Sequence, residues 1–280
     1  MRGPSHTKRV TRGDLILYLD PEYDIPRIYE FIEAIRSGDL SQVSQLESSE
    51  YARVYRFELP AFAGHQTFYC KEFLFRSPGD RLLATFRKSR ARRAWEGATL
   101  LLNHRFHTAR PVALVEDRTL GIVRRNFLLT EALEGAKNLD AYLEDEHVAS
   151  SGEPSGTCRK RAVIALLGRT IGRMHRMGVF PGDLRVRNIL VQNSARLRVA
   201  FIDNERTGRS RHMARRKILK NLVQVNMILS PAVSATDRVR FFHAYLQENP
   251  GLANSRKGRR EWMDRIQRRA RARLSRKGYI

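Results

Sequence analysis

The chain has 280 residues, of which 42% are hydrophobic, and its 52 Lys and Arg residues against 29 Asp and Glu give a formal net charge of +23. This length suits one large domain or two small lobes around a real core, and the apolar content is too high for a disordered chain. No apolar stretch is long enough for a transmembrane helix. The N-terminal segment lacks the apolar region of a signal peptide. Two cysteines, Cys70 and Cys158, are too few for a disulfide framework and favour a reducing compartment, so we expect a cytoplasmic protein.

The first half of the chain reads mainly as strands. Alternating apolar residues and turn signals predict the strands, and apolar residues at helical spacing predict the helices. We expect strands at 15–19, 51–59, 67–75, 110–116 and 124–131, with helices at 26–37 and 82–103. Strands around so few helices indicate a small α+β lobe.

The second half reads mainly as helices. We expect one helix to start at 139–143 and others at 161–177, 218–229, 237–247 and 255–277. The last of these segments is strongly basic, and it places Trp262, Ile266, Ala270 and Leu274 at four-residue spacing. That spacing is typical of an amphipathic helix.

The segment from 178 to 207 carries the most informative chemistry. Asp183 precedes Asn188 by four intervening residues, Asn188 leads into an apolar strand, and a second strand ends in Asp203. If the two strands pair as a hairpin, these three side chains meet at one end of it. Phosphoryl transfer uses such a set, because one carboxylate orients the acceptor hydroxyl while an amide oxygen and a second carboxylate hold magnesium.

The ordered motifs resemble the bacterial lipopolysaccharide core kinase family, which phosphorylates heptose or Kdo and belongs to the protein-kinase-like superfamily. The catalytic pattern is GVFPGDLRVRNILV followed by FID, and RRAWEGATLL, ARPVALVE, FLLTEALEG, RKILKNLVQVN and DRVRFFHAYL also match over residues 50–247. The resemblance implies an α+β, two-lobed fold. A small antiparallel-sheet lobe precedes a larger, mainly helical lobe.

The resemblance also implies roles for individual residues. Lys71, in a strand, would contact the α- and β-phosphates of ATP, and Glu96, in the following helix, would hold that lysine. Asp183 would orient the sugar hydroxyl and accept its proton. The remaining expected ligands are Glu131 and Ala132 for adenine, through their backbone, and Asn188 and Asp203 for Mg²⁺.

Three departures from the superfamily pattern are evident. Pro181 stands where a histidine usually supports the catalytic loop, and Asn204–Glu205 replaces Phe-Gly after the metal aspartate. The loop PAFAGHQ, between two predicted strands, lacks the glycine-rich run that covers phosphates. Arg185 and Arg187 lie within the catalytic loop, where they could meet an anionic acceptor or be solvated.

The resulting prediction is an ATP-dependent kinase acting on a sugar hydroxyl of the lipopolysaccharide inner core. It comprises an N-terminal extension (1–50), an N-lobe (51–131), a C-lobe (132–250) and a basic C-terminal helix (251–280). The alternatives are a protein Ser/Thr kinase and a non-catalytic pseudokinase that binds anionic lipid or nucleic acid. The basic C-terminus could be a solvated face or could attach to the anionic inner face of the inner membrane. No zinc-finger or RNA-binding motif supports nucleic acid as a partner.

Overall fold

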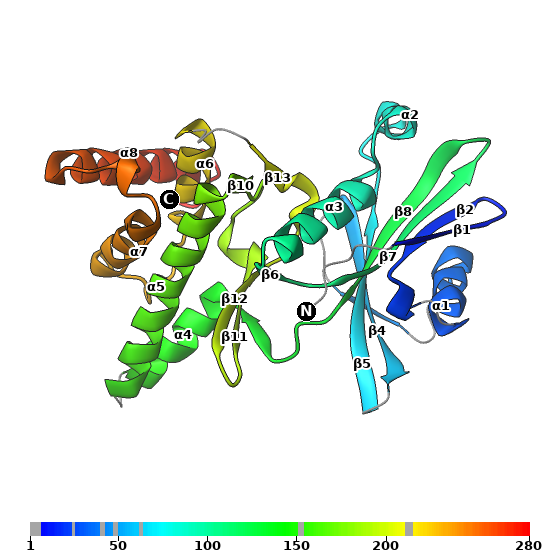
Figure 1. The fold of residues 1–280 in the computed structure, drawn as a ribbon, viewed down its shortest axis with the longest axis horizontal. Coiled ribbons are helices and arrows are strands. Elements are labelled where there is room, and N and C mark those ends of the chain that lie inside the picture. The colour runs from blue at the N-terminus through cyan, green and yellow to red at the C-terminus, as the bar shows by residue number, and fades with distance from the viewer. Residues whose placement is uncertain are drawn as a thin grey trace. The chain divides into compact units, whose positions relative to one another are not determined.

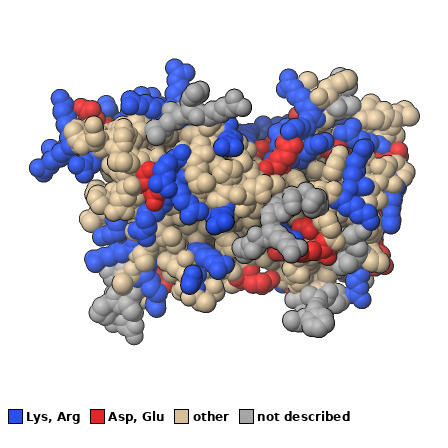
Figure 2. Space-filling view, in the orientation of Figure 1, with Lys and Arg blue, Asp and Glu red and all other residues tan. Residues whose placement is uncertain are grey.

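The computed structural model describes residues 7–23, 26–39, 43–46, 50–61, 64–150, 154–210 and 215–280. The chain divides into two compact units, unit 1 (Met1–Glu134) and unit 2 (Gly135–Ile280) (Figure 1). In the described ranges, none of the helices is both long enough and apolar enough to cross a membrane. Lys and Arg side chains are widespread on the face drawn in Figure 2, as the net charge of +23 requires.

Unit 1 is built on a seven-stranded antiparallel sheet in the order β1-β2-β7-β8-β5-β4-β3. Its strands are β1 (Lys8–Arg12), β2 (Leu15–Leu19), β3 (Ser44–Leu46), β4 (Ala52–Ala61), β5 (Gly64–Phe73), β7 (Pro111–Thr119) and β8 (Ile122–Glu131); a short strand, β6 (His107–Thr108), precedes β7. Its helices are α1 (Pro26–Ser37), α2 (Pro78–Phe86) and α3 (Arg90–Asn103). The five strands expected from the sequence are therefore confirmed. The segment 1–50, expected to be an extension, supplies β1, β2, α1 and β3 to this unit.

The two faces of this sheet carry different helices. Ile28, Phe31 and Ile35 of α1 share one apolar core with Phe57 of β4 and Cys70 of β5. Cys70 is only 1% exposed, and burial raises the pKa of its thiol. A second core joins α3 to β5, β7 and β8; its members are Phe73, Ala91, Ala94, Trp95, Leu114 and Leu128.

The expected single helix at 82–103 is wrong, because the segment forms two helices. Ser77 caps α2 by accepting a hydrogen bond from the backbone N–H of Asp80 at 3.1 Å. Ser89 then caps α3 in the same way, accepting from the backbone N–H of Arg92 at 3.1 Å. A serine at this position favours a helix start because it satisfies an N–H that has no partner within the helix. The tip of the PAFAGHQ loop, residues 62–63, lies outside the described residues.

Unit 2 is mainly helical. Its strands are β9 (Ala136–Asn138), β10 (Val179–Phe180), β11 (Ile189–Asn193), β12 (Leu197–Phe201) and β13 (Gly208–Arg209), and its helices are α4 (Leu139–Ser150), α5 (Pro154–Arg176), α6 (Arg215–Val225), α7 (Ala235–Glu248) and α8 (Arg256–Ser275). Gly168 lets α5 lie close to α7, because a Cβ there would be 2.4 Å from the Phe241 carbonyl oxygen. The helices expected in this half are confirmed, with α6 ending at Val225 rather than at 229.

The C-terminal helix α8 uses its apolar face inside the protein. Ile266, Ala270 and Leu274 are 1%, 4% and 5% exposed, respectively, and α8 packs against α6. The four-residue spacing read from the sequence therefore reflects internal packing. The surface that α8 offers to solvent is rich in arginine, and contact with an anionic leaflet would have to use these charges instead of inserted apolar side chains.

Candidate active site

The hairpin of β11 and β12 places Asn188 and Asp203 at the same end. Ile189 pairs with Phe201 at that end of the ladder, and the Ile202 N–H donates to the Asn188 carbonyl oxygen at 2.9 Å. Asn188 directly precedes β11, and Asp203 follows β12 after one further residue. The hairpin expected from the sequence is therefore confirmed.

Asp203 has a left-handed backbone conformation, with φ 60° and ψ 54°. This conformation is uncommon for residues other than glycine, although Asp and Asn tolerate it best. The Asp203 side chain is exposed. Such strained backbone often occurs at functional sites, where the surrounding structure enforces it.

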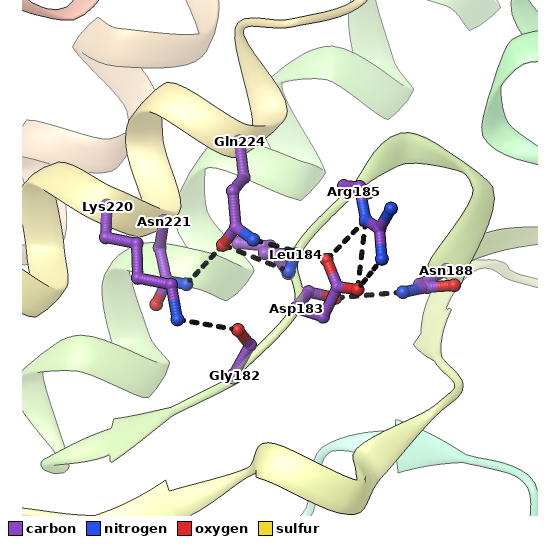
Figure 3. A network of polar contacts seen from close by, with 8 residues as sticks. All are labelled: Gly182, Asp183, Leu184, Arg185, Asn188, Lys220, Asn221 and Gln224. Carbon is purple, nitrogen blue, oxygen red and sulfur yellow. Dashed lines mark hydrogen bonds and ion pairs between the residues drawn. The ribbon is translucent and has the colours of Figure 1, made fainter. Parts of the chain in front are cut away.

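Asp183 lies in the loop between β10 and β11, and Asn188 closes that loop (Figure 3). The Asn188 Nδ2 donates to the Asp183 carbonyl oxygen at 3.1 Å, and the Asn188 backbone N–H donates to the Arg185 carbonyl oxygen at 2.8 Å. Asn188 itself is 7% exposed. Asp183 and Asn188 are thus joined directly, and Asp203 lies at the same end of the hairpin as Asn188.

Arg185 binds the Asp183 carboxylate through two of its N–H groups. Its Nε lies 2.7 Å from Oδ1 and 2.9 Å from Oδ2, and its Nη2 also donates to Oδ2. Burial alone would raise the pKa of Asp183, but the hydrogen bond from Arg185 and the charges of Arg185, Arg187 and Arg206 outweigh it, so the pKa is lowered. Asp183 is therefore ionised at neutral pH, as a residue that accepts a proton must be.

Helix α6 holds this loop with three polar side chains from one turn (Figure 3). Asn221 Nδ2 donates to the Pro181 carbonyl oxygen at 2.7 Å, and Lys220 Nζ donates to the Gly182 carbonyl oxygen at 2.9 Å. Gln224 reaches two groups: its Oε1 accepts from the Leu184 N–H at 3.3 Å, and its Nε2 donates to Asp183 Oδ1 at 3.2 Å. Sequence reasoning missed these residues, although they lie in the segment RKILKNLVQVN that carried part of the resemblance.

A buried histidine, His175, holds the Asn221 side chain in place by a hydrogen bond. The His175 ring contacts Asn221 Oδ1 at 3.1 Å through Nε2 and the Tyr245 hydroxyl at 3.0 Å through Nδ1. It also stacks on the Phe180 ring at a centroid distance of 5.0 Å. His175 is 1% exposed, and burial lowers its pKa to about 4. His175 is thus packed inside unit 2, and its hydrogen bonds link the helical core to the loop in a chain that has Pro181 at the usual histidine position.

Gly182 is required by a close approach to Arg206. A Cβ at Gly182 would lie 2.0 Å from the Arg206 Cβ and 2.2 Å from the Arg206 carbonyl oxygen. No side chain fits at these distances without moving the backbone. The segment after Asp203 therefore packs directly on the loop that carries Asp183.

The predicted nucleotide residues lie in unit 1. Lys71, in β5, lies on the same face of the sheet as Phe73, because side chains two residues apart in a strand point the same way. Its Nζ is 5.2 Å from the Phe73 ring centroid, and Phe73 packs in the core with α3, the helix that bears Glu96. Glu96 binds Lys88 Nζ at 2.8 Å and lies 3.6 Å from Arg92 Nε. Pairing of Lys71 with Glu96 stays a prediction.

The expected adenine contacts lie at the end of β8, with Glu131 as its last residue and Ala132 directly after it. The Ala132 N–H donates to the Thr67 carbonyl oxygen at 2.9 Å, and the Glu131 N–H donates to the Arg110 carbonyl oxygen at 2.9 Å. The Glu131 carboxylate accepts from the Tyr23 hydroxyl. Both backbone N–H groups are used within the unit, and contact with adenine stays a prediction.

The donor set at the end of the hairpin fits magnesium. Asn188 uses its Nδ2 within the loop, which leaves its Oδ1 for a ligand, and Figure 3 shows that oxygen directed away from Asp183. Together with the Asp203 carboxylate it would supply two hard oxygen ligands, and Mg²⁺ usually takes one or two protein oxygens with phosphate and water for the rest. The described residues contain no cluster of three or more His, Cys, Asp and Glu side chains that could hold a metal alone.

Comparison with known proteins agrees with this reading. The model of the lipopolysaccharide kinase (Kdo/WaaP) family matches residues 40–245. A solved structure described as WaaP in complex with acyl carrier protein is similar to this chain, with a TM-score of 0.62 and 22% sequence identity over 91% of this chain and 98% of that one. None of the curated proteins matches. The structural likeness confirms the expected α+β fold with an N-terminal antiparallel sheet and a helical C-terminal part.

The buried His175 predicts a pH-dependent stability. Because its folded pKa of about 4 lies below the ordinary value of 6.5, the unfolded chain binds this proton first as the pH falls. The contribution of neutral His175 to the free energy of unfolding is therefore complete above pH 6.5. It is lost as the pH falls toward 4, and the free energy of unfolding decreases by up to about 3 kcal/mol. Denaturant unfolding of wild type and His175→Gln should show their stability difference shrinking over this range. The exposed His243→Gln serves as control, and a constant difference for His175→Gln would contradict the assignment.

A second prediction concerns the Arg185–Asp183 pair. In Arg185→Ala the burial of Asp183 remains while its main opposing contact is gone, so the pKa of Asp183 should rise. The measurement is a carbon-13 NMR titration of the aspartate carboxyl groups. Arg198→Ala, which removes an exposed arginine from β12, should leave the pKa of Asp183 unchanged. An unchanged Asp183 pKa in Arg185→Ala would refute the contact.

Proposed function

Since the chain belongs to the lipopolysaccharide kinase (Kdo/WaaP) family, we propose that it transfers the γ-phosphoryl group of ATP to a sugar hydroxyl, on heptose or Kdo, of the lipopolysaccharide inner core. The observation that carries the proposal is the grouping of Asp183, Asn188 and Asp203 at one end of the β11–β12 hairpin. Carboxylate, amide and carboxylate are the groups that phosphoryl transfer needs there.

Asp183 orients the acceptor hydroxyl and accepts its proton. A carboxylate has about four acceptor positions, and the N–H groups of Arg185 and Gln224 occupy most of them while holding the group in place. The remaining position suits the sugar hydroxyl. Arg185 keeps Asp183 ionised, and it also brings a positive charge close to the γ-phosphate that the hydroxyl attacks.

Asn188 Oδ1 and the Asp203 carboxylate would hold Mg²⁺. When bound, the ion offsets the charge that develops on the phosphate oxygens. Lys71 would contact the α- and β-phosphates with Glu96 as its partner, and Glu131 and Ala132 would border adenine through their backbone. For Lys71, the support is its place on the α3 face of the sheet, two residues before Phe73.

The acceptor suits the charge of the protein. A surplus of 52 Lys and Arg over 29 Asp and Glu raises the local concentration of an anionic substrate such as a phosphorylated or carboxylated glycan. We place the enzyme in the cytoplasm, at the inner face of the inner membrane, where the arginine-rich surface of α8 would meet anionic headgroups.

The direct test follows label from γ-labelled ATP with magnesium into purified inner-core lipopolysaccharide. Wild type should label the glycan, and Asp183→Asn should lower the turnover number by about 10²–10⁴-fold, the usual contribution of a general base. Asp183→Asn should still bind magnesium-ATP. Asp145→Asn, at an exposed carboxylate paired with Lys137, is the matched control and should label normally.

Other results would select the alternatives. Magnesium-ATP binding without label on the glycan would contradict the sugar acceptor and favour a protein Ser/Thr kinase. Absence of both nucleotide binding and transfer would favour a non-catalytic module that binds anionic lipid or nucleic acid.

A further inference from the structure

Facing stripes of α6 and α8 line a basic groove of about 300 Å³ in unit 2. The residues that line it are Arg216, Leu219, Lys220, Val223, Arg269, Ala272, Arg273 and Arg276. On each helix they follow the i, i+3, i+4, i+7 pattern of a single face. The groove therefore has an apolar floor and cationic walls on both helices.

The described residues that line the groove include five cationic side chains and no carboxylate. None of Arg216, Lys220, Arg269, Arg273 and Arg276 forms an ion pair with a carboxylate of the described residues. Like charges that line one groove repel one another and raise the free energy of the folded protein. Burial, first of all, and the charges of Arg206 and Arg273 lower the pKa of Lys220, while the charge of Asp183 opposes them. A multivalent anion in the groove would relieve this repulsion.

The groove leads to the catalytic loop. Lys220, at its wall, donates to the Gly182 carbonyl oxygen at 2.9 Å, and Gly182 is the residue before Asp183. Gln224, four residues further along α6, donates to Asp183 Oδ1 at 3.2 Å. A molecule held between α6 and α8 would therefore extend toward the carboxylate that the proposed reaction uses.

The shape of the groove favours compact anionic groups over a membrane surface. Its stripe of eight residues on each helix, from i to i+7, spans about 10 Å, which matches two charged groups on neighbouring sugars better than one free ion. The apolar residues Ile266, Ala270 and Leu274 of α8 are buried and cannot insert into lipid. Figure 2 shows several Lys and Arg side chains over the α8 region, where a charged ligand would approach.

We propose that the groove between α6 and α8 binds the acceptor through at least two of its phosphate or carboxylate groups and so delivers its hydroxyl to Asp183. This inference rests on the proposed kinase function, because that function makes Asp183 the group that the bound acceptor must reach. It adds a binding site, separate from the nucleotide residues, that selects acceptors by their charge.

The test measures binding without ATP, by calorimetry on the full chain. The probe is deacylated inner-core oligosaccharide with its phosphates, compared with the same oligosaccharide after phosphatase treatment. The variant Arg269→Gln/Arg273→Gln/Arg276→Gln removes three charges from the groove. The matched control, Arg256→Gln/Arg260→Gln/Arg265→Gln, removes three charges from exposed positions on the same helix outside the groove, so both proteins have the same net charge.

The groove variant should bind the phosphorylated oligosaccharide about tenfold more weakly, and the control less than about twofold more weakly than wild type. The phosphatase-treated oligosaccharide should bind wild type weakly. Arg216→Gln, on the facing helix, should weaken binding in the same direction. Because neutralising mutually repelling charges does not remove packing, the unfolding midpoint of the groove variant should not fall.

Three results would contradict acceptor binding in the groove. The first is equal oligosaccharide binding by the groove variant and wild type, and the second is an equal loss of binding in the groove and control variants. The third is a groove variant that loses binding to phosphatidylglycerol vesicles but keeps its binding to the oligosaccharide. The transfer assay separates this proposal from the kinase function. Groove-dependent binding without transfer would refute only the kinase, whereas transfer with an unchanged KM for the acceptor in the groove variant would refute only the groove.

Discussion

The candidate site depends on one set of hydrogen bonds, those from a single turn of α6 to the loop that carries Asp183. Lys220, Asn221 and Gln224 bind the backbone of Pro181, Gly182 and Leu184. Each of these backbone groups would otherwise need another partner, and an unsatisfied buried polar group costs about 1–3 kcal/mol. His175 then fixes Asn221 by donating from Nε2 to its amide oxygen and is itself held by a hydrogen bond between Nδ1 and the Tyr245 hydroxyl, so the loop is tied to the helical core of unit 2.

Electrostatics supplies the second constraint. Asp183 is the one carboxylate of the catalytic loop, and Arg185, Arg187 and Arg206 keep it ionised despite its burial. The same excess of cations continues in the groove between α6 and α8, whose five cationic side chains form no ion pair with a carboxylate of the described residues. The net charge of +23 thus has two local consequences: Asp183 stays ionised, and the groove that leads to it is lined by cationic side chains. In water both effects weaken as salt is added.

The sequence predicted the fold and the convergence of Asn188 with Asp203, because strand alternation and short turns are local signals. It did not predict the break between α2 and α3, since the Ser89 cap competes with a continuous helical pattern. It also missed Asn221 and Gln224, whose role depends on contacts across about 40 residues of chain that no spacing rule reveals. The spacing of Ile266, Ala270 and Leu274 was visible, but a periodic pattern alone cannot tell a face buried in the protein from one that meets lipid.

The most direct test of this account replaces Gln224 with methionine, which keeps the shape of the side chain and removes its hydrogen bonds to Leu184 and Asp183. We predict that Gln224→Met lowers the turnover number at least about tenfold with an unchanged KM for ATP. Hydrogen exchange at the Leu184 amide should become faster in the same protein. A turnover number and a Leu184 exchange rate equal to those of wild type would show that α6 does not hold the loop and would contradict the account.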